Sequence, residues 1–176
     1  MRIRLAREED WKVCAELDIA YETESAWQMQ ELRGDREWGV RFREVRLPRP
    51  QRIPSASSPD EWLKAWERAD GFWVAVEHRK IVGYVAVILE PEHYQGRFLA
   101  LAVTTEKRRQ GMGTALLEHA NAWCLRQGMQ QVILECSLKA QPAISFALKH
   151  RFAFCGYQDA YWPGQEVAIF FRKRIR

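Results

Sequence analysis

The sequence predicts an α/β (α+β) fold in which a central mixed, mostly antiparallel sheet of six to seven strands is flanked by about four helices. Three observations lead to this prediction. The 176 residues, 47% hydrophobic and 28% charged, have the size and composition of one globular domain, residues 1–176. Three β-rich runs follow one another between residues 72 and 103. Amphipathic helical stretches separate the remaining strands, and no internal repeat is present.

The first third of the chain begins with a strand and a helix. "RIRLA" alternates as a short strand does, and residues 7–21 then predict a helix behind an acidic first turn. Residues 26–47 predict a hairpin with its turn at Gly34-Asp35. The residues that carry these predictions are Trp11, Cys14, Leu17 and Tyr21 at helical spacing, and Trp38, Val40 and Phe42 on one face of a strand.

Residues 48–59 contain four prolines and three serines, which predicts a loop without regular structure. A helix is expected next, with serine or aspartate available as N-cap and an end near Gly71. Trp62, Leu63 and Trp66 would share one of its faces.

The rest of the chain predicts a three-stranded meander followed by alternating helices and strands. Strands are expected within residues 72–90 on both sides of a polar "EHRK" turn, and again in "RFLALAVTTE". A helix should run from Gly113 to Gln127, with Gly128 just beyond its C-cap. The last expected elements are a strand at 129–136, a helix at 141–151, and strands at 152–159 and 166–175.

Charge and cysteine content narrow the possible partners. The net charge of +4 and pI near 9.0 are compatible with an anionic cofactor. Seven arginines against three acids lie between Arg33 and Arg52, but they alternate with apolar residues, so solvated strand faces are expected there and no nucleic acid. Four scattered cysteines without CxxC spacing indicate reduced thiols and no metal. With no signal peptide and no membrane segment, a cytoplasmic protein is expected.

The stretch "VTTEKRRQGMGTALLEHA" predicts a turn that receives an anion. A strand, a basic glycine-containing turn and a helix would direct several backbone N–H groups at one point. Arg108 and Arg109 add charge that could reach phosphate oxygens. A mononucleotide P-loop is excluded because no lysine follows the second glycine, and Leu116 stands where a dinucleotide fingerprint has its third glycine.

"RRQGMG" also satisfies the pattern [RQ]-x-x-G-x-[GA], and with its context the chain resembles the GCN5-related N-acetyltransferase (GNAT) superfamily over nearly its whole length. This resemblance implies acetyl-CoA as cosubstrate. It implies that loop amides hold the pyrophosphate, that the preceding strand pairs with pantetheine, and that a bulge or splay opens the sheet nearby. The implied cofactor-binding residues are Leu101, Ala102, Val103, Arg108, Arg109, Gln110, Gly111, Met112, Gly113 and Thr114.

The catalytic residues that the resemblance implies are only partly present. Family members often have a tyrosine as general acid where this chain has Ala147 in "AQPAISFALKHRF". General-acid help is worth about 10²–10⁴ in rate, so its loss slows or reroutes the reaction. Tyr157 is the candidate replacement, with Tyr161, Ser145 and Cys155 as alternatives.

Glu135 in "VILEC" lies where some relatives have a glutamate that serves as the base, twelve residues before Ala147. Other candidates for the base are Glu90, Glu92 and His93.

The acceptor-binding region is expected to combine carboxylates with aromatic rings, which suits a cationic amine. The candidates are Glu24, Trp27, Trp38, Glu90 and Tyr161, with Glu22, Met29 and Trp162 in the same segments. A loose similarity to the streptothricin-acetyltransferase branch suggests a small polycationic amine or antibiotic, while a peptide amine stays open. A non-catalytic acyl-CoA-binding module is the alternative function, and an exposed C-terminal edge strand could permit a homodimer.

Overall fold

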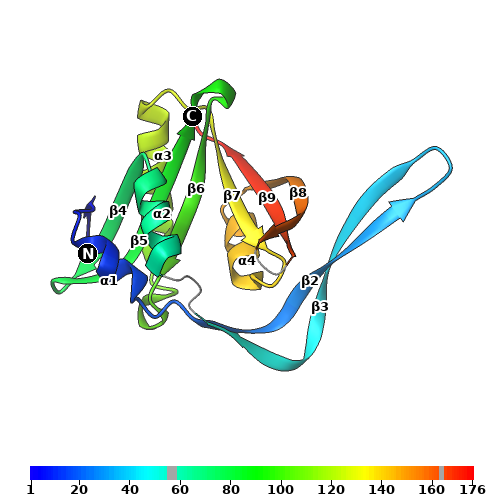
Figure 1. Ribbon diagram of the computed structural model, residues 1–176, viewed down its shortest axis with the longest axis horizontal. Coiled ribbons are helices and arrows are strands. Elements are labelled where there is room, and N and C mark those ends of the chain that lie inside the picture. The colour runs from blue at the N-terminus through cyan, green and yellow to red at the C-terminus, as the bar shows by residue number, and fades with distance from the viewer. Residues whose placement is uncertain (55–58, 163–164) are drawn as a thin grey trace. The chain divides into compact units, whose positions relative to one another are not determined.

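The computed structural model describes residues 1–54, 59–162 and 165–176. Its elements follow the predicted order (Figure 1). They are β1 (Arg2–Leu5), α1 (Asp10–Ala15), β2 (Tyr21–Arg33), β3 (Trp38–Ile53), α2 (Pro59–Arg68), β4 (Gly71–Glu77), β5 (Lys80–Glu90), η1 (Pro91–His93), β6 (Gln95–Val103), η2 (Thr105–Lys107), α3 (Met112–Arg126), β7 (Gln131–Ser137), α4 (Gln141–Lys149), β8 (Ala153–Trp162) and β9 (Glu166–Arg174).

Seven strands form one sheet in the order β1-β4-β5-β6-β7-β9-β8, and β2 and β3 form a separate two-stranded sheet. The pairs β1–β4, β4–β5 and β5–β6 are antiparallel, whereas β6 and β7 are parallel. The predicted open, mixed sheet flanked by four α-helices is therefore confirmed.

The chain divides into two compact units, which are described separately below. The first unit comprises residues 1–21, 54–134 and 172–176, and the second comprises residues 22–53 and 135–171. The extent of a single domain over residues 1–176 stays a prediction.

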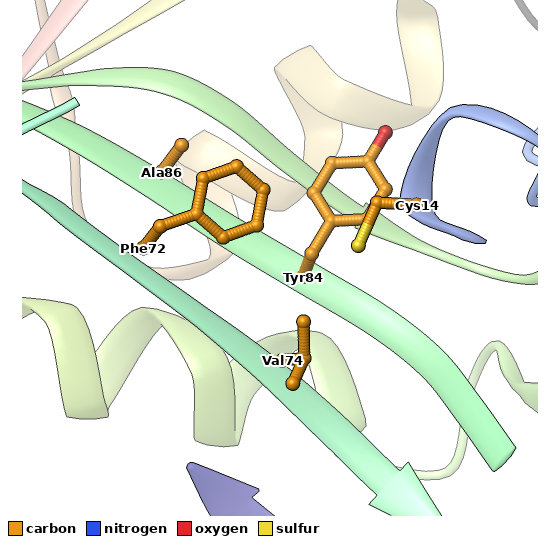
Figure 2. Packing of buried hydrophobic residues seen from close by; sticks show 5 residues of the cluster. All are labelled: Cys14, Phe72, Val74, Tyr84 and Ala86. Carbon is orange, nitrogen blue, oxygen red and sulfur yellow. The ribbon is translucent and has the colours of Figure 1, made fainter. Parts of the chain in front are cut away.

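The core of the first unit lies on both faces of the meander because its strands alternate their side chains. Phe72 and Val74 of β4 face the same way as Tyr84 and Ala86 of β5, and Cys14 of α1 packs on them. Figure 2 shows the Tyr84 ring between Phe72 and Cys14. Burial raises the pKa of the Cys14 thiol to about 12, so this thiol is a packing group.

The intervening residues of β4 cover the other face, where α3 packs. The Trp73 ring lies 4.9 Å from that of Trp123 and 5.3 Å from that of His119, both on α3. Leu116 and Leu117 of α3 are fully buried. The predicted helix is confirmed, and Gly128 beyond its C-cap adopts φ +82 as expected. This packing fixes the start of α3 against the end of β6.

The first helix is shorter than predicted. It ends at Ala15, so the expectation that helical spacing continues to Leu17 and Tyr21 was wrong. Asp10 anchors its start, since the Arg4 guanidinium donates to both carboxylate oxygens at 2.6 and 3.0 Å. Beyond Ala15 the backbone carbonyls of residues 18–20 accept hydrogen bonds from a loop far along the sequence, and this replaces further helical turns.

The predicted hairpin is confirmed, but the loop predicted over residues 48–59 was wrong for residues 48–53, where β3 continues to Ile53. Proline is compatible with a strand that has a free edge, and β3 pairs only with β2 in its two-stranded sheet. Trp38, Val40 and Phe42 all lie on β3 at alternate positions, which gives them one face as expected, and Trp38 is 83% exposed.

The second predicted helix is present as α2 and ends three residues before Gly71. It spans Pro59–Arg68, and the Trp66 ring lies 4.8 Å from that of Phe72. Leu63 is exposed. A serine N-cap and the side chain of Trp62 lie outside the described residues.

Candidate functional site

The first unit contains the predicted anion-binding turn, which we call the donor loop, residues 104–114. It runs from the end of β6 into the first turn of α3. Arg109 and Gly111 adopt left-handed backbone conformations, with φ of +63 and +83. No atom lies within 4 Å of the position where a Cβ on Gly111 would stand, so the backbone there is open to an approaching group.

The donor loop has two kinds of backbone amide: those of Thr104, Thr105, Lys107 and Arg108 donate to backbone carbonyls, whereas those that follow, up to Gly113, have no acceptor among the described residues. The N–H groups of residues 109–113 make no hydrogen bond with any other described residue, and no side chain caps α3. The first amides of a helix carry the positive end of its dipole. Unpaired amides beside an open glycine are suited to a phosphate group. That these residues hold the pyrophosphate of acetyl-CoA stays a prediction.

The Arg108 side chain was expected to reach phosphate oxygens, but in the structure it binds backbone carbonyls. Its guanidinium donates to three backbone carbonyls, those of Val103 at 3.0 Å, Ala20 at 2.9 Å and Ile19 at 2.6 Å. The backbone N–H of Thr105 donates a hydrogen bond to the Asp18 carbonyl at 3.1 Å, and its hydroxyl donates one to the Ala20 carbonyl at 3.0 Å. The Arg108 charge thus stabilises the loop, and sequence analysis missed this role because two of the three acceptors, Ile19 and Ala20, lie nearly ninety residues away in the sequence.

The strand before the donor loop has the irregularity that the family resemblance implied. Val87 pairs with Phe98 and Ala86 with Ala100, so Leu99 is an extra, bulged residue on β6. The register with β7 covers three pairs and ends at Arg97 opposite Ile133. In the described register, residues 98–103 pair with β5 alone, which leaves backbone groups on the second edge of β6 for an extended ligand such as pantetheine.

In the second unit, Glu135 and Tyr161 come together. The Tyr161 hydroxyl donates to Glu135 Oε2 at 2.8 Å, and both side chains are half-buried. The Tyr161 ring also packs edge-on against Phe170, with centroids 5.6 Å apart. Glu135 had been predicted as the base and Tyr161 as an acceptor-binding residue, but sequence analysis did not predict that they are partners.

Tyr157, the predicted replacement for the general acid, has a different neighbour. Its ring packs edge-on against Phe42 of β3 at 5.8 Å. Ala160, between Tyr157 and Tyr161, has φ +50, which interrupts the regular alternation of β8. Ala147 is fully buried in α4, so the family's tyrosine position holds no polar side chain.

The other predicted acceptor-binding residues are dispersed. Glu24 lies 3.9 Å from Arg46 across the hairpin, and the Trp27 amide donates to the Leu138 carbonyl at 2.8 Å. The Trp27 indole N–H is buried with no partner among the described residues. Trp38 lies at the exposed start of β3.

Glu90 lies at the far end of β5 from the donor loop, where it pairs with Gln95 at the start of β6. Arg97 donates to its carboxylate at 2.7 and 3.1 Å. Arg97, with help from Gln95, holds the pKa of Glu90 below its usual range. The geometry thus gives Glu90 an ion pair with Arg97 inside the first unit.

Within the described residues, no three or more His, Cys, Asp or Glu side chains gather in a way that could hold a metal ion. None of the described helices is both long and apolar enough to span a bilayer.

Comparison with known sequences finds relatives of this chain. The model of the acetyltransferase (GNAT) family matches residues 40–153, more than half of the chain. N-acetyltransferase 8B of Rattus norvegicus is 32% identical over 101 residues, which cover 55% of this chain and 44% of the relative. The match spans about half the length of the curated relatives.

Solved structures share the fold over almost the whole chain. Nourseothricin acetyltransferase superposes with a TM-score of 0.85 at 23% identity, covering 99% of this chain and 98% of that one. A Bacillus anthracis str. Ames protein assigned as a streptothricin acetyltransferase, solved with acetyl coenzyme A, gives a TM-score of 0.75 at 17% identity, covering 99% and 97%. At these identities the likeness concerns the fold.

Proposed function

This chain belongs to the acetyltransferase (GNAT) family, and on that premise we propose that it is an N-acetyltransferase, which moves an acetyl group from acetyl-CoA to a primary amine by direct attack in a ternary complex. The single observation that carries the proposal is the donor loop. Its amides at residues 109–113 have no acceptor among the described residues, and Gly111 leaves room for a phosphate to approach. Bound acetyl-CoA supplies an activated thioester to this site.

The residues of the first unit would bind the donor through their backbone. Amides 109–113 and the helix dipole of α3 stabilise the pyrophosphate charge. Leu101, Ala102 and Val103 present backbone groups on the second edge of β6 to the pantetheine arm. Arg108 holds the loop in shape through its three carbonyl contacts, which leaves Arg109 as the nearby side chain with a guanidinium that no described residue binds.

Glu135 would act as the base. A primary amine with a pKa near that of lysine is almost wholly protonated at pH 7, so it must lose a proton before it can attack. A Glu135 carboxylate oxygen accepts that proton, and the hydroxyl of Tyr161 fixes the orientation of the carboxylate through Oε2. A second carboxylate, Glu24, and the Phe42 and Tyr157 rings of the same unit suit a cationic acceptor.

The proposed acceptor is a small polycationic amine. Nourseothricin acetyltransferase and a protein assigned as a streptothricin acetyltransferase share the fold, and the acidic and aromatic residues of the second unit are compatible with a cation. We place the reaction in the cytoplasm, where the four free cysteines would stay reduced.

Ala147 supports a second candidate, a non-catalytic module that binds acyl-CoA. This position is buried and cannot protonate a departing thiolate. A coenzyme A thiolate has a pKa near that of cysteine, about 8.5, so the first candidate does not depend on strong acid catalysis.

A free-thiol assay distinguishes the two candidates. The protein is incubated with acetyl-CoA and a panel of amines: polyamines, streptothricin-like and aminoglycoside-like compounds, and short peptides. The enzyme predicts thiol release with at least one amine class, above the rate without acceptor. Tight acetyl-CoA binding without turnover on any amine would favour the module, and failure to bind acetyl-CoA would reject both.

A further inference from the structure

A hollow of about 490 Å³ lies in the first unit, at the end of β6 opposite the donor loop. Three segments line it: residues 93–94 before β6, residues 130–131 at the start of β7, and residues 174–176 at the end of β9. In Figure 1 the C-terminus lies beside the turn that joins β5 to β6. β6 has nine residues, so its two ends lie roughly 25 Å apart. The hollow is therefore separate from the donor loop.

Backbone hydrogen bonds hold these three segments together. The Gln130 amide donates to the Tyr94 carbonyl at 2.8 Å, and the Ile175 amide donates to the Gln130 carbonyl at 3.0 Å. The Gln131 side chain donates to Oε1 of Gln95, the first residue of β6, at 3.2 Å. The main chain therefore gives the hollow a frame that folding fixes.

The side chains that line the hollow are basic or neutral. Its polar lining residues are His93, Tyr94, Gln130, Gln131, Arg174 and Arg176. Arg174 and Arg176 are exposed, and their guanidinium groups form no ion pair or hydrogen bond with any described residue. Of the acids that precede His93 in the sequence, Glu92 does not line the hollow and Glu90 is already paired with Arg97. Two guanidinium groups without a partner are suited to a phosphate group.

Tyr94 adds an aromatic face to the hollow. It is 59% exposed, and its φ of +50 lies in the left-handed region, which is uncommon for a residue with a Cβ. Its amide donates to the Pro91 carbonyl at 3.1 Å and so closes the short helix η1. An exposed ring held in this way can stack on a planar ring of a ligand. The exposed carboxamide of Gln130 offers donors and an acceptor to polar atoms at the edge of such a ring.

We propose that this hollow is a second binding site, which takes a small molecule that carries both a phosphate group and a planar ring, as a nucleoside monophosphate does. Arg174 and Arg176 bind the phosphate, the Tyr94 ring stacks on the planar ring, and Gln130 bonds to its edge. The volume of about 490 Å³ lies within the range of small-molecule pockets, roughly 300–1,000 Å³. The site is independent of the proposed acetyl transfer, because it shares no residue with the donor loop or with Glu135 and Tyr161.

Calorimetric titration with AMP tests this proposal. Wild type should bind AMP with a Kd below about 1 mM. Gly111→Val forces a β-branched residue into the donor loop at φ +83 and should leave this AMP affinity unchanged, since the hollow lies elsewhere. Loss of AMP binding in Gly111→Val would place AMP at the donor loop and overturn the proposal, as would no heat of binding in wild type at about 5 mM AMP.

Removal of the two arginine charges tests the phosphate contact. Arg174→Gln combined with Arg176→Gln should raise the Kd for AMP at least about 10-fold, because charge-assisted hydrogen bonds to the phosphate are lost. Arg2→Gln combined with Arg79→Gln is the matched control, since both residues are exposed in the first unit and neither lines the hollow. An equal rise in Kd in the two double variants would overturn the proposal.

The contact with the planar ring is tested by Tyr94→Leu, which removes the aromatic face and keeps an apolar side chain. The Kd for AMP should rise about 10-fold, whereas the Kd for ribose 5-phosphate, which has no planar ring, should stay unchanged. Thermal unfolding of each variant shows whether it is folded at the temperature of the titration. Equal affinity of wild type for AMP and ribose 5-phosphate would overturn the assignment of a planar ring to Tyr94.

Discussion

The donor loop and the Glu135–Tyr161 pair differ in the groups that they use. The donor loop offers backbone amides from consecutive residues, with a glycine that leaves them open. The pair joins two side chains that lie 26 residues apart on β7 and β8. A site built from backbone depends on local conformation, whereas a site built from side chains depends on how distant strands meet.

The largest expected loss of kcat follows substitution of Glu135, the proposed general base. Glu135→Gln removes the proton acceptor but keeps the shape of the side chain, so kcat should fall about 10²–10⁴-fold while the affinity for acetyl-CoA stays unchanged. Steady-state kinetics together with calorimetric titration of acetyl-CoA measure both quantities. Glu166→Gln is the matched control, since Glu166 is also a strand glutamate of the second unit and pairs with Lys139 and Ser137. Equal losses in the two variants would argue against a special role for Glu135.

A substitution in the donor loop should weaken the binding of acetyl-CoA. Gly111→Val forces a β-branched residue into a left-handed conformation and fills the open space, so acetyl-CoA should bind about 10–100-fold more weakly. Gly128→Val is the control, because Gly128 has φ +82 and an equally open environment but lies at the other end of α3. Both variants should lose similar thermal stability. Loss of acetyl-CoA affinity in both would mean that backbone strain, and not the loop, explains the effect.

The partner of the base should contribute less than the base itself. Tyr161→Phe removes the hydroxyl that donates to Glu135 and keeps the ring against Phe170, so kcat should fall roughly 10-fold. Tyr157→Phe should lower kcat more than this if Tyr157 is the general acid, and pre-steady-state thiol release would measure the difference. Unchanged rates in both variants would leave only Glu135 of the proposed catalytic side chains.

The smallest effect on turnover is expected where a side chain supports the donor loop. Arg108→Lys replaces three hydrogen-bond contacts with a single ammonium group, so the free energy of unfolding should fall by about 1–3 kcal/mol and acetyl-CoA affinity only a few-fold. Denaturant unfolding and calorimetry provide the two values. Arg109→Lys preserves the charge at a residue without such contacts and should leave stability unchanged. A large loss of affinity without loss of stability would indicate that Arg108 binds phosphate directly.

Sequence reasoning succeeded where structure is set locally. The order of the elements, the meander, α3 and its terminal Gly128 follow from periodicity and from glycine conformation, and all are present in the structure. It failed where distant residues intervene. Residues 48–53 continue β3 because this strand has a free edge that tolerates proline, and α1 stops at Ala15 where loop residues bind the carbonyls that follow.

The amino-acid sequence alone was enough to predict the family and the position of the donor loop. A run of amides at the start of a helix needs only the spacing of Arg108, Gly111 and Gly113. Tertiary structure decided which side chains meet. It placed the Tyr161 hydroxyl on Glu135, turned the Arg108 guanidinium toward Ile19 and Ala20, and left Trp38 exposed at the start of β3. The physical reason is that a side-chain contact depends on strand register and on local breaks such as the left-handed Ala160, which no short pattern in the sequence encodes.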